Sequence, residues 1–186
     1  MLLKRIYIGT ITFTKETLSV TDPCYNEDVW CRLDSVQIFP GTYDCYCYKP
    51  VKKDGTLEEN RPMIAQIVLQ DGFTEDKINE KESWRFIGEI GVDAGLAGFF
   101  QNKPDFKDEE WFNFCDNLWK EDGEEKDETV KYAYFYEEND KSAKGFFTSS
   151  GYGDGGYPVY AIYDSIDGKH RIAALEIRFL EEAEEE

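Results

Sequence analysis

Apolar and polar positions alternate along much of the chain, and this two-residue period predicts β-strands. Residues 4–13, KRIYIGTITF, are rich in β-branched and aromatic residues, and residues 17–23 continue the pattern until Pro23, which cannot donate to a strand ladder. Comparable stretches follow, among them residues 63–70 and 84–95. We therefore expect a mainly β (α+β) fold, an antiparallel β-sandwich or rolled sheet of about eight or nine strands.

Two turn signals indicate how neighbouring strands connect. Pro40-Gly41 separates residues 34–39 from residues 42–51 and predicts a hairpin between them. Asp167-Gly168 separates the last two strand-like stretches and is a favoured dipeptide for a two-residue hairpin turn. Within residues 42–51, one face of the expected strand carries a tyrosine and two cysteines, and the other carries two further tyrosines.

One segment has helical rather than strand periodicity. Residues 105–123, DFKDEEWFNFCDNLWKEDG, place Trp111, Cys115, Leu118 and Trp119 on one face, with acidic residues in the expected first turn. This predicts one main helix near residues 106–120, inside an acidic insertion at about 104–128. We expect residues 1–180 to form a single globular domain and residues 181–186 to be an acidic tail.

Negative charge is concentrated in the second half of the chain. The 186 residues carry a formal net charge of −18, yet residues 1–53 are close to neutral. Residues 105–128 alone hold 11 acidic and 3 basic side chains. Such a field repels nucleic acids and membrane surfaces, whose binding depends on Lys and Arg, and it attracts a basic protein surface.

These charges favour a binding protein over an enzyme. Five cysteines, an odd number, and the lack of a long apolar run predict a cytoplasmic protein with reduced thiols. We expect a non-enzymatic protein that binds a basic partner, for example a phage or mobile-element inhibitor occupying the basic nucleic-acid-binding surface of a host defence protein. The expected contact residues are Asp108, Glu109, Glu121, Asp122, Glu124 and Glu125.

A dense glycine loop lies at residues 149–160, SSGYGDGGYPVY. It matches G-x-G-x-x-G, but a dinucleotide site requires the glycines to lead into a helix, and this loop leads into a strand-like stretch. The loop is either a sharp connection, with Asp154 capping its own turn, or a ligand loop. For the ligand loop the candidate residues are Gly151, Gly153, Asp154, Gly155, Gly156 and Tyr157.

Three aspartates, Asp22, Asp93 and Asp154, occur in turn-like phrases near strand ends. If they converge, they form an all-oxygen site for Mg or Ca, or an acid and base pair for hydrolysis. The alternative function is therefore a small-molecule-binding or metal-dependent hydrolytic domain, with a pocket formed by the Gly151–Gly156 loop, Asp22 and Asp93. The simpler interpretation is three separate turn aspartates.

A zinc site formed by cysteines is a further alternative. Cys24, Cys31, Cys45 and Cys47 have the residue types for a zinc site but not the usual spacing, so buried thiols are expected. His170 is the single histidine, and no neighbour in the sequence suggests a nucleophile for it.

Four phrases together resemble a known family. They are VTDPCY at residues 20–25, GTYDCY at 41–46, GVDAGLAGF at 91–99 and SGYGDGGYPVY at 150–160. In this order they resemble the bacterial and phage family of unknown function numbered 4241, over about residues 18–180. The resemblance implies a shared fold and no particular activity, and the acidic segment lies outside the matching phrases.

Overall fold

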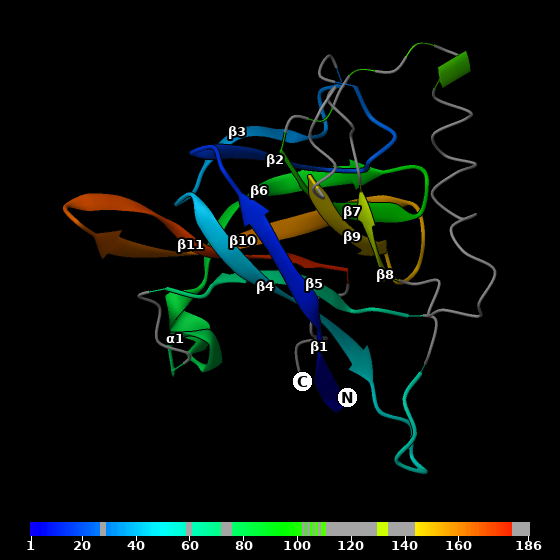
Figure 1. Ribbon diagram of the computed structural model, residues 1–186. Helices are drawn as coiled ribbons and strands as arrows, with labels where there is room; N and C mark the ends of the chain where they lie inside the picture. The colour runs from blue at the N-terminus through cyan, green and yellow to red at the C-terminus, as the bar shows by residue number, and fades with distance from the viewer. Residues whose placement is uncertain are drawn as a thin grey trace.

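Two antiparallel sheets make up the protein, as the alternating pattern predicts (Figure 1). The computed structural model describes residues 1–26, 29–58, 61–71, 76–101, 103, 105, 107, 109–110 and 144–179, and the backbone of 130–133. One sheet has six strands in the order β1-β4-β5-β11-β10-β6, and the other has five in the order β3-β2-β7-β9-β8.

The elements have the following bounds. The strands of the six-stranded sheet are β1 Leu3–Phe13, β4 Gly41–Pro50, β5 Ile64–Leu69, β6 Arg85–Val92, β10 Gly155–Ile166 and β11 Lys169–Arg178. Those of the five-stranded sheet are β2 Thr17–Thr21, β3 Leu33–Gln37, β7 Leu96–Phe100, β8 Val130–Ala133 and β9 Gly145–Ser149. A helix, α1 Asp76–Asn79, and a 3-10 turn, Lys81–Ser83, precede β6.

The core lies between the two sheets and follows the alternation in the sequence. Tyr43, Cys45 and Cys47 of β4 are fully buried, whereas Tyr46 and Tyr48 on the opposite face are partly exposed. Tyr43 and Cys45 belong to one hydrophobic cluster, which also includes Phe99 and other aromatic and aliphatic side chains from the five-stranded sheet. Burial of such apolar area is the main stabilising contribution to the fold.

Part of the outer face of the six-stranded sheet is also covered. Ile78 of α1 packs with Val68, Ile162 and Ala174 in a second, smaller cluster, and Trp84 lies against it. The Trp84 indole N–H donates to the Ile78 carbonyl oxygen over 3.0 Å. Residues 76–82 are largely polar in the sequence, yet they include α1 and its buried Ile78.

The predicted hairpin between residues 34–39 and 42–51 is wrong. Strand β3 pairs with β2 in one sheet, and β4 pairs with β1 and β5 in the other. The Pro40-Gly41 turn therefore carries the chain from one sheet to the other. Phe39, just before this turn, accepts a 2.7 Å hydrogen bond from the Tyr43 hydroxyl. A turn signal marks a change of direction but does not say which strands pair.

The strand predicted within residues 84–95 is confirmed as β6, Arg85–Val92, but the strand that follows it was not predicted. Strand β6 ends at Val92, and the chain turns through Gly95, with a φ of +65°, into β7 of the other sheet. The unpredicted strand β7, Leu96–Phe100, is one reason why the described part of the chain holds 11 strands rather than about eight or nine.

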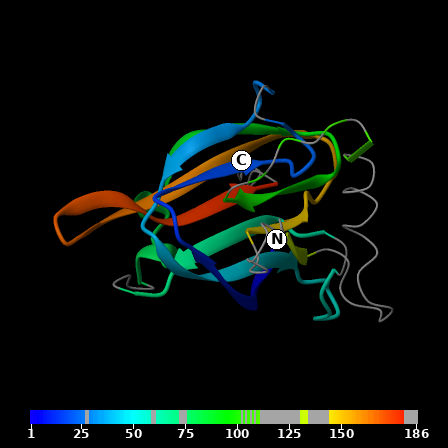
Figure 2. The same cartoon turned by 45° about the horizontal axis from the view of Figure 1, so that its top comes forward.

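The C-terminal hairpin is confirmed. Strands β10 and β11 pair through Ile166 and Lys169, and Asp167 and Gly168 have φ values of +50° and +76°. Positive φ at both central residues is what the favoured two-residue hairpin turn requires. The tip of this hairpin, in orange, extends beyond the sheets in both views (Figures 1 and 2).

Most of the predicted helix near residues 106–120 lies outside the described residues, as does the tail at 181–186. No helix among the residues that the structure describes has the length and apolar composition needed to cross a membrane.

Candidate functional site

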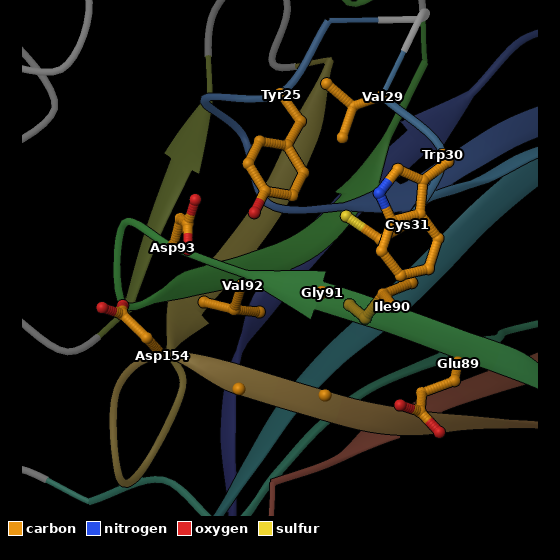
Figure 3. Close-up of a pocket in the computed structure, with 12 residues that line it drawn as sticks. Tyr25, Val29, Trp30, Cys31, Glu89, Ile90, Gly91, Val92, Asp93 and Asp154 are labelled. Atoms are coloured by element: carbon orange, nitrogen blue, oxygen red, sulfur yellow. The ribbon is translucent and has the colours of Figure 1, made fainter.

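A cleft of about 850 Å³ opens where the β2–β3 loop lies across the ends of β6 and β10 (Figure 3). Strand β6 is the last strand of the six-stranded sheet, so the loop covers an edge that would otherwise be open. The cleft is lined by Tyr25, Val29, Trp30 and Cys31 of the loop, Glu89–Asp93 of β6 and the turn after it, and Asp154–Gly156.

Glycines allow the loop to approach the sheet closely. The Gly91 N–H donates to the Cys31 carbonyl oxygen over 2.8 Å, which ties the loop to β6. A Cβ atom on Gly91 would lie only 2.8 Å from the Cys31 sulfur. Gly156 pairs with Gly91 in the β10–β6 ladder, and a side chain there would require the exposed Glu89 carboxylate to move. A larger residue in place of Gly91 or Gly156 would therefore occupy part of the cleft or move the side chains that line it.

Asp22 is the anchor beneath this site. Its side chain is fully buried and accepts a hydrogen bond from the Cys24 N–H over 2.8 Å. The second carboxylate oxygen accepts hydrogen bonds from the backbone N–H groups of Asp93, over 3.0 Å, and Ala94, over 2.7 Å. Burial raises the pKa of Asp22 above its usual value, although these three N–H groups act in the opposite direction. Asp22 thus joins the β2–β3 loop to the β6–β7 turn and does not line the cleft.

Asp93 and Asp154 lie beside the open cleft, and both are exposed. Asp93 follows the end of β6, and Asp154 precedes the start of β10, so pairing of these two strands brings the aspartates to one side of the cleft (Figure 3). The three aspartates therefore divide into one buried anchor and two cleft residues. Among the described residues, no group of three His, Cys, Asp or Glu side chains is arranged to hold a metal ion.

The glycine loop is partly a structural turn. The Ser150 hydroxyl and the Tyr157 hydroxyl both donate to the Gly153 carbonyl oxygen, over 2.6 and 2.8 Å. Gly151, with a φ of +65°, packs so closely that a Cβ would lie 2.9 Å from the Pro62 carbonyl oxygen. Ser150 and Tyr157 therefore close this turn.

Only half of the predicted ligand loop faces the cleft. Asp154, Gly155 and Gly156 line it, whereas Gly151, Gly153 and Tyr157 belong to the turn. The loop leads directly into β10, which agrees with the exclusion of a dinucleotide site.

The sequence pattern did not point to several cleft residues. Trp30 is 93 % exposed, and Tyr25 directs its hydroxyl between Asp93 and Cys31 (Figure 3). Burial, followed by the nearby Cys31 and Asp93, raises the pKa of the Tyr25 phenol. A large aromatic residue in a polar loop, as in NEDVWC, was the available signal for Trp30.

The other cysteine and histidine candidates, apart from Cys31, do not line the cleft. Cys45 and Cys47 are fully buried in the core, and Cys24, Cys31, Cys45 and Cys47 are all free thiols. His170 lies in the exposed part of the C-terminal hairpin, where its Nδ1 is 3.0 Å from the Ser165 hydroxyl and its ring stacks on Tyr163. Ser165 and His170 lie opposite each other across the hairpin, and neither lines the cleft.

Comparisons with known proteins returned no match: no family model, no curated protein and no solved structure matches the chain. The resemblance to the family numbered 4241 therefore stays a prediction.

Proposed function

We propose that this is an acidic, non-enzymatic binding protein that holds a basic surface of another protein, with the cleft as a contact site. The observation that carries the proposal is the lining of the cleft. The described residues that line it include three carboxylates, Glu89, Asp93 and Asp154, and no Lys, Arg or His. It also presents the nearly fully exposed indole of Trp30.

This lining complements a lysine or arginine side chain. Carboxylates pair with the charged head, and an aromatic face attracts a cation that lies over it. The apolar floor, which includes Ile90 and Val92, suits the aliphatic part of the same side chain. At longer range, the net charge of −18 would steer a basic protein toward this one and raise the association rate.

One partner class with this chemistry is the basic nucleic-acid-binding surface of a host defence protein. A phage or mobile-element inhibitor in the cytoplasm would occupy such a surface in place of the nucleic acid. The net charge of −18 and the acidic lining of the cleft support this choice of partner.

An oligo-arginine peptide tests the cleft directly by titration calorimetry. We expect the double variant Asp93→Asn/Asp154→Asn to bind the peptide about tenfold more weakly, because two charge-assisted hydrogen bonds are lost. Trp30→Ala should weaken binding as well, through loss of the cation–π contact. The effect should diminish as salt is added, since both aspartates are exposed.

The matched control removes the same charge elsewhere. Asp71 and Glu82 are exposed and do not line the cleft, so Asp71→Asn/Glu82→Gln should change peptide binding little. If the two double variants weaken binding equally, the attraction is only that of the overall charge, and the cleft is not the contact site.

The acidic segment belongs to the same proposal. Glu109 is exposed, and Asp108, Glu121, Asp122, Glu124 and Glu125 lie outside the described residues. Charge reversal at all six positions is expected to abolish binding of a basic partner protein, measured by the same titration. Unchanged binding in that variant would assign recognition to the cleft alone.

A further inference from the structure

A second, smaller cavity of about 200 Å³ lies against the five-stranded sheet and shares no lining residue with the cleft. Its walls come from β2, the start of β3 and the chain after β7. The charged residues around it are Lys15, Arg32, Lys103 and Asp34, and the hydroxyls are those of Thr17, Ser19 and Ser35. Three cationic side chains and one carboxylate thus gather in a protein whose net charge is −18.

Arg32 is held rigidly in this cavity. Its Nε and Nη2 atoms donate to one oxygen of Asp34, over 3.0 and 2.7 Å, and its Nη1 donates to the Tyr25 carbonyl oxygen over 2.9 Å. Nη2 also lies 3.2 Å from the Ser19 hydroxyl oxygen. Only 2 % of the side chain is exposed. These contacts fix the guanidinium before any ligand arrives and use four of its five N–H donors, so an anion would meet the second N–H of Nη1.

Lys103 is the second buried cation that lines this cavity, with 9 % of its surface exposed. Burial, and next the positive charge of Arg32, lowers its pKa to about 8, while Asp105, Cys24 and Asp22 act in the opposite direction. Asp34 already balances the charge of Arg32, and an anion beside Lys103 would favour the charged form of this lysine. Lys15 is exposed at the rim and adds a third positive charge.

Strand β3 has an irregular backbone at this cavity. Leu18 of β2 pairs with Val36, and Val20 pairs with Leu33, so Asp34 and Ser35 together face the single residue Ser19. Ser35 has a φ of +57°, a left-handed conformation that is unfavourable for serine. Bulges and strained residues of this kind are concentrated at functional sites. At this bulge, Ser19 and Ser35 both lie on the cavity wall.

We propose that this cavity binds a small oxyanion, the chemical group shared by phosphate, sulfate and carboxylate ligands, between Arg32 and Lys103. The hydroxyls of Ser35 and Thr17 supply further donors, and Lys15 lies at the rim, whereas the Ser19 hydroxyl donates to Asp34 over 2.7 Å. The site shares no lining residue with the cleft, and this proposal does not rest on the function proposed for the cleft.

Sulfate is the first probe, because its charge does not change across the working pH range. We expect saturable binding of sulfate by titration calorimetry at constant ionic strength in chloride, with shifts of the backbone amide signals of Ser19 and Ser35 in nuclear magnetic resonance spectra. Inorganic phosphate and acetate form two further arms. Tighter binding of phosphate than acetate identifies a phosphate-type ligand, and the reverse order identifies a carboxylate. No saturable binding of any of the three overturns the proposal.

Two variants and a control keep the test specific. Lys103→Gln should weaken sulfate binding about tenfold, the usual effect of losing one charged hydrogen bond. Because Lys103 is buried, Lys15→Gln, at the exposed rim, provides a second variant that leaves the core untouched and should also weaken binding. Lys53→Gln removes an exposed charge that does not line the cavity and should have no effect. Equal losses in all three variants would overturn the assignment.

The pH dependence gives an independent readout. Lys103 has a pKa of about 8 in the absence of an anion, with Arg32, Asp105, Cys24 and Asp22 around it. Sulfate affinity should therefore be lower at about pH 9.5, where this lysine is neutral, than at about pH 6.5. In Lys103→Gln the two affinities should be equal. A pH effect of the same size in that variant would contradict the role of Lys103.

Discussion

Replacing Asp22 with alanine is expected to lower the free energy of unfolding by about 3 kcal/mol, since three backbone donors lose their acceptor together. The N–H groups of Cys24, Asp93 and Ala94 all point at this one carboxylate. The β2–β3 loop and the β6–β7 turn would separate, and the cleft between them would lose its shape. Urea denaturation measures the change in stability.

Two further variants separate this explanation from a simple effect of charge. Asp22→Asn keeps one acceptor oxygen and should fall between the wild type and the alanine variant. Asp93→Ala removes an exposed carboxylate beside the same turn and should change stability by no more than about 0.5 kcal/mol. If Asp93→Ala is as destabilising as Asp22→Ala, the buried hydrogen bonds are not the cause.

The second large effect is expected at Glu176, in the middle of the six-stranded sheet. Its carboxylate is 3 % exposed, and it accepts hydrogen bonds from the Gln66 amide over 3.0 Å and the Arg178 Nε over 2.6 Å. Gln66 in turn accepts a 3.1 Å hydrogen bond from the Arg5 Nε. Burial raises the pKa of Glu176, and Arg178 opposes that shift. A polar chain thus crosses β1, β5 and β11 on the outer face of the sheet.

Aromatic side chains flank this polar chain. Arg5 lies over the Tyr46 ring, 3.5 Å from its centre, and Arg178 lies over the Tyr160 ring at 3.9 Å. Strand pairing places one residue from each of the six strands in a single transverse row: Tyr7, Tyr46, Gln66, Glu176, Tyr160 and Phe86. The rings and guanidinium groups shield the two central polar residues from water, which accounts for their burial.

Glu176→Ala is expected to cost about 3–5 kcal/mol, because it leaves a buried amide and a guanidinium without their acceptor. Glu176→Gln retains the shape and one acceptor and should cost less. Glu89→Ala serves as the matched control, since Glu89 is an exposed glutamate in the same sheet. Urea unfolding at neutral pH compares the three variants. A loss no larger in Glu176→Ala than in Glu89→Ala would contradict the proposed network.

Local patterns in the sequence were sufficient for most strands and for one connection. The alternation in residues 42–51 correctly placed Tyr43, Cys45 and Cys47 on one face of the strand, because a strand directs successive side chains to opposite faces, and the structure shows that this face is the buried one. Asp167 and Gly168 correctly predicted the final hairpin, because both adopt the positive φ that this turn requires. These features depend only on residues that are close together in the chain.

Contacts between residues that are distant in the sequence could not be predicted from these local patterns. Asp22 looked like a candidate catalytic residue, yet its donors at Asp93 and Ala94 lie about 70 positions away, and only the folded chain brings them together. Glu176 stood in an apolar run, where its role depends on Gln66 of another strand. Sequence proximity carries no information about such contacts.

The sequence by itself determined the mainly β class, the acidic charge and the ends of several strands, because backbone conformation and alternation are local properties. Only the tertiary structure decided which sheet each strand joins, which aspartate is buried and which residues share the cleft. Those outcomes depend on packing two sheets against each other, and the same turn and strand signals are compatible with more than one pairing.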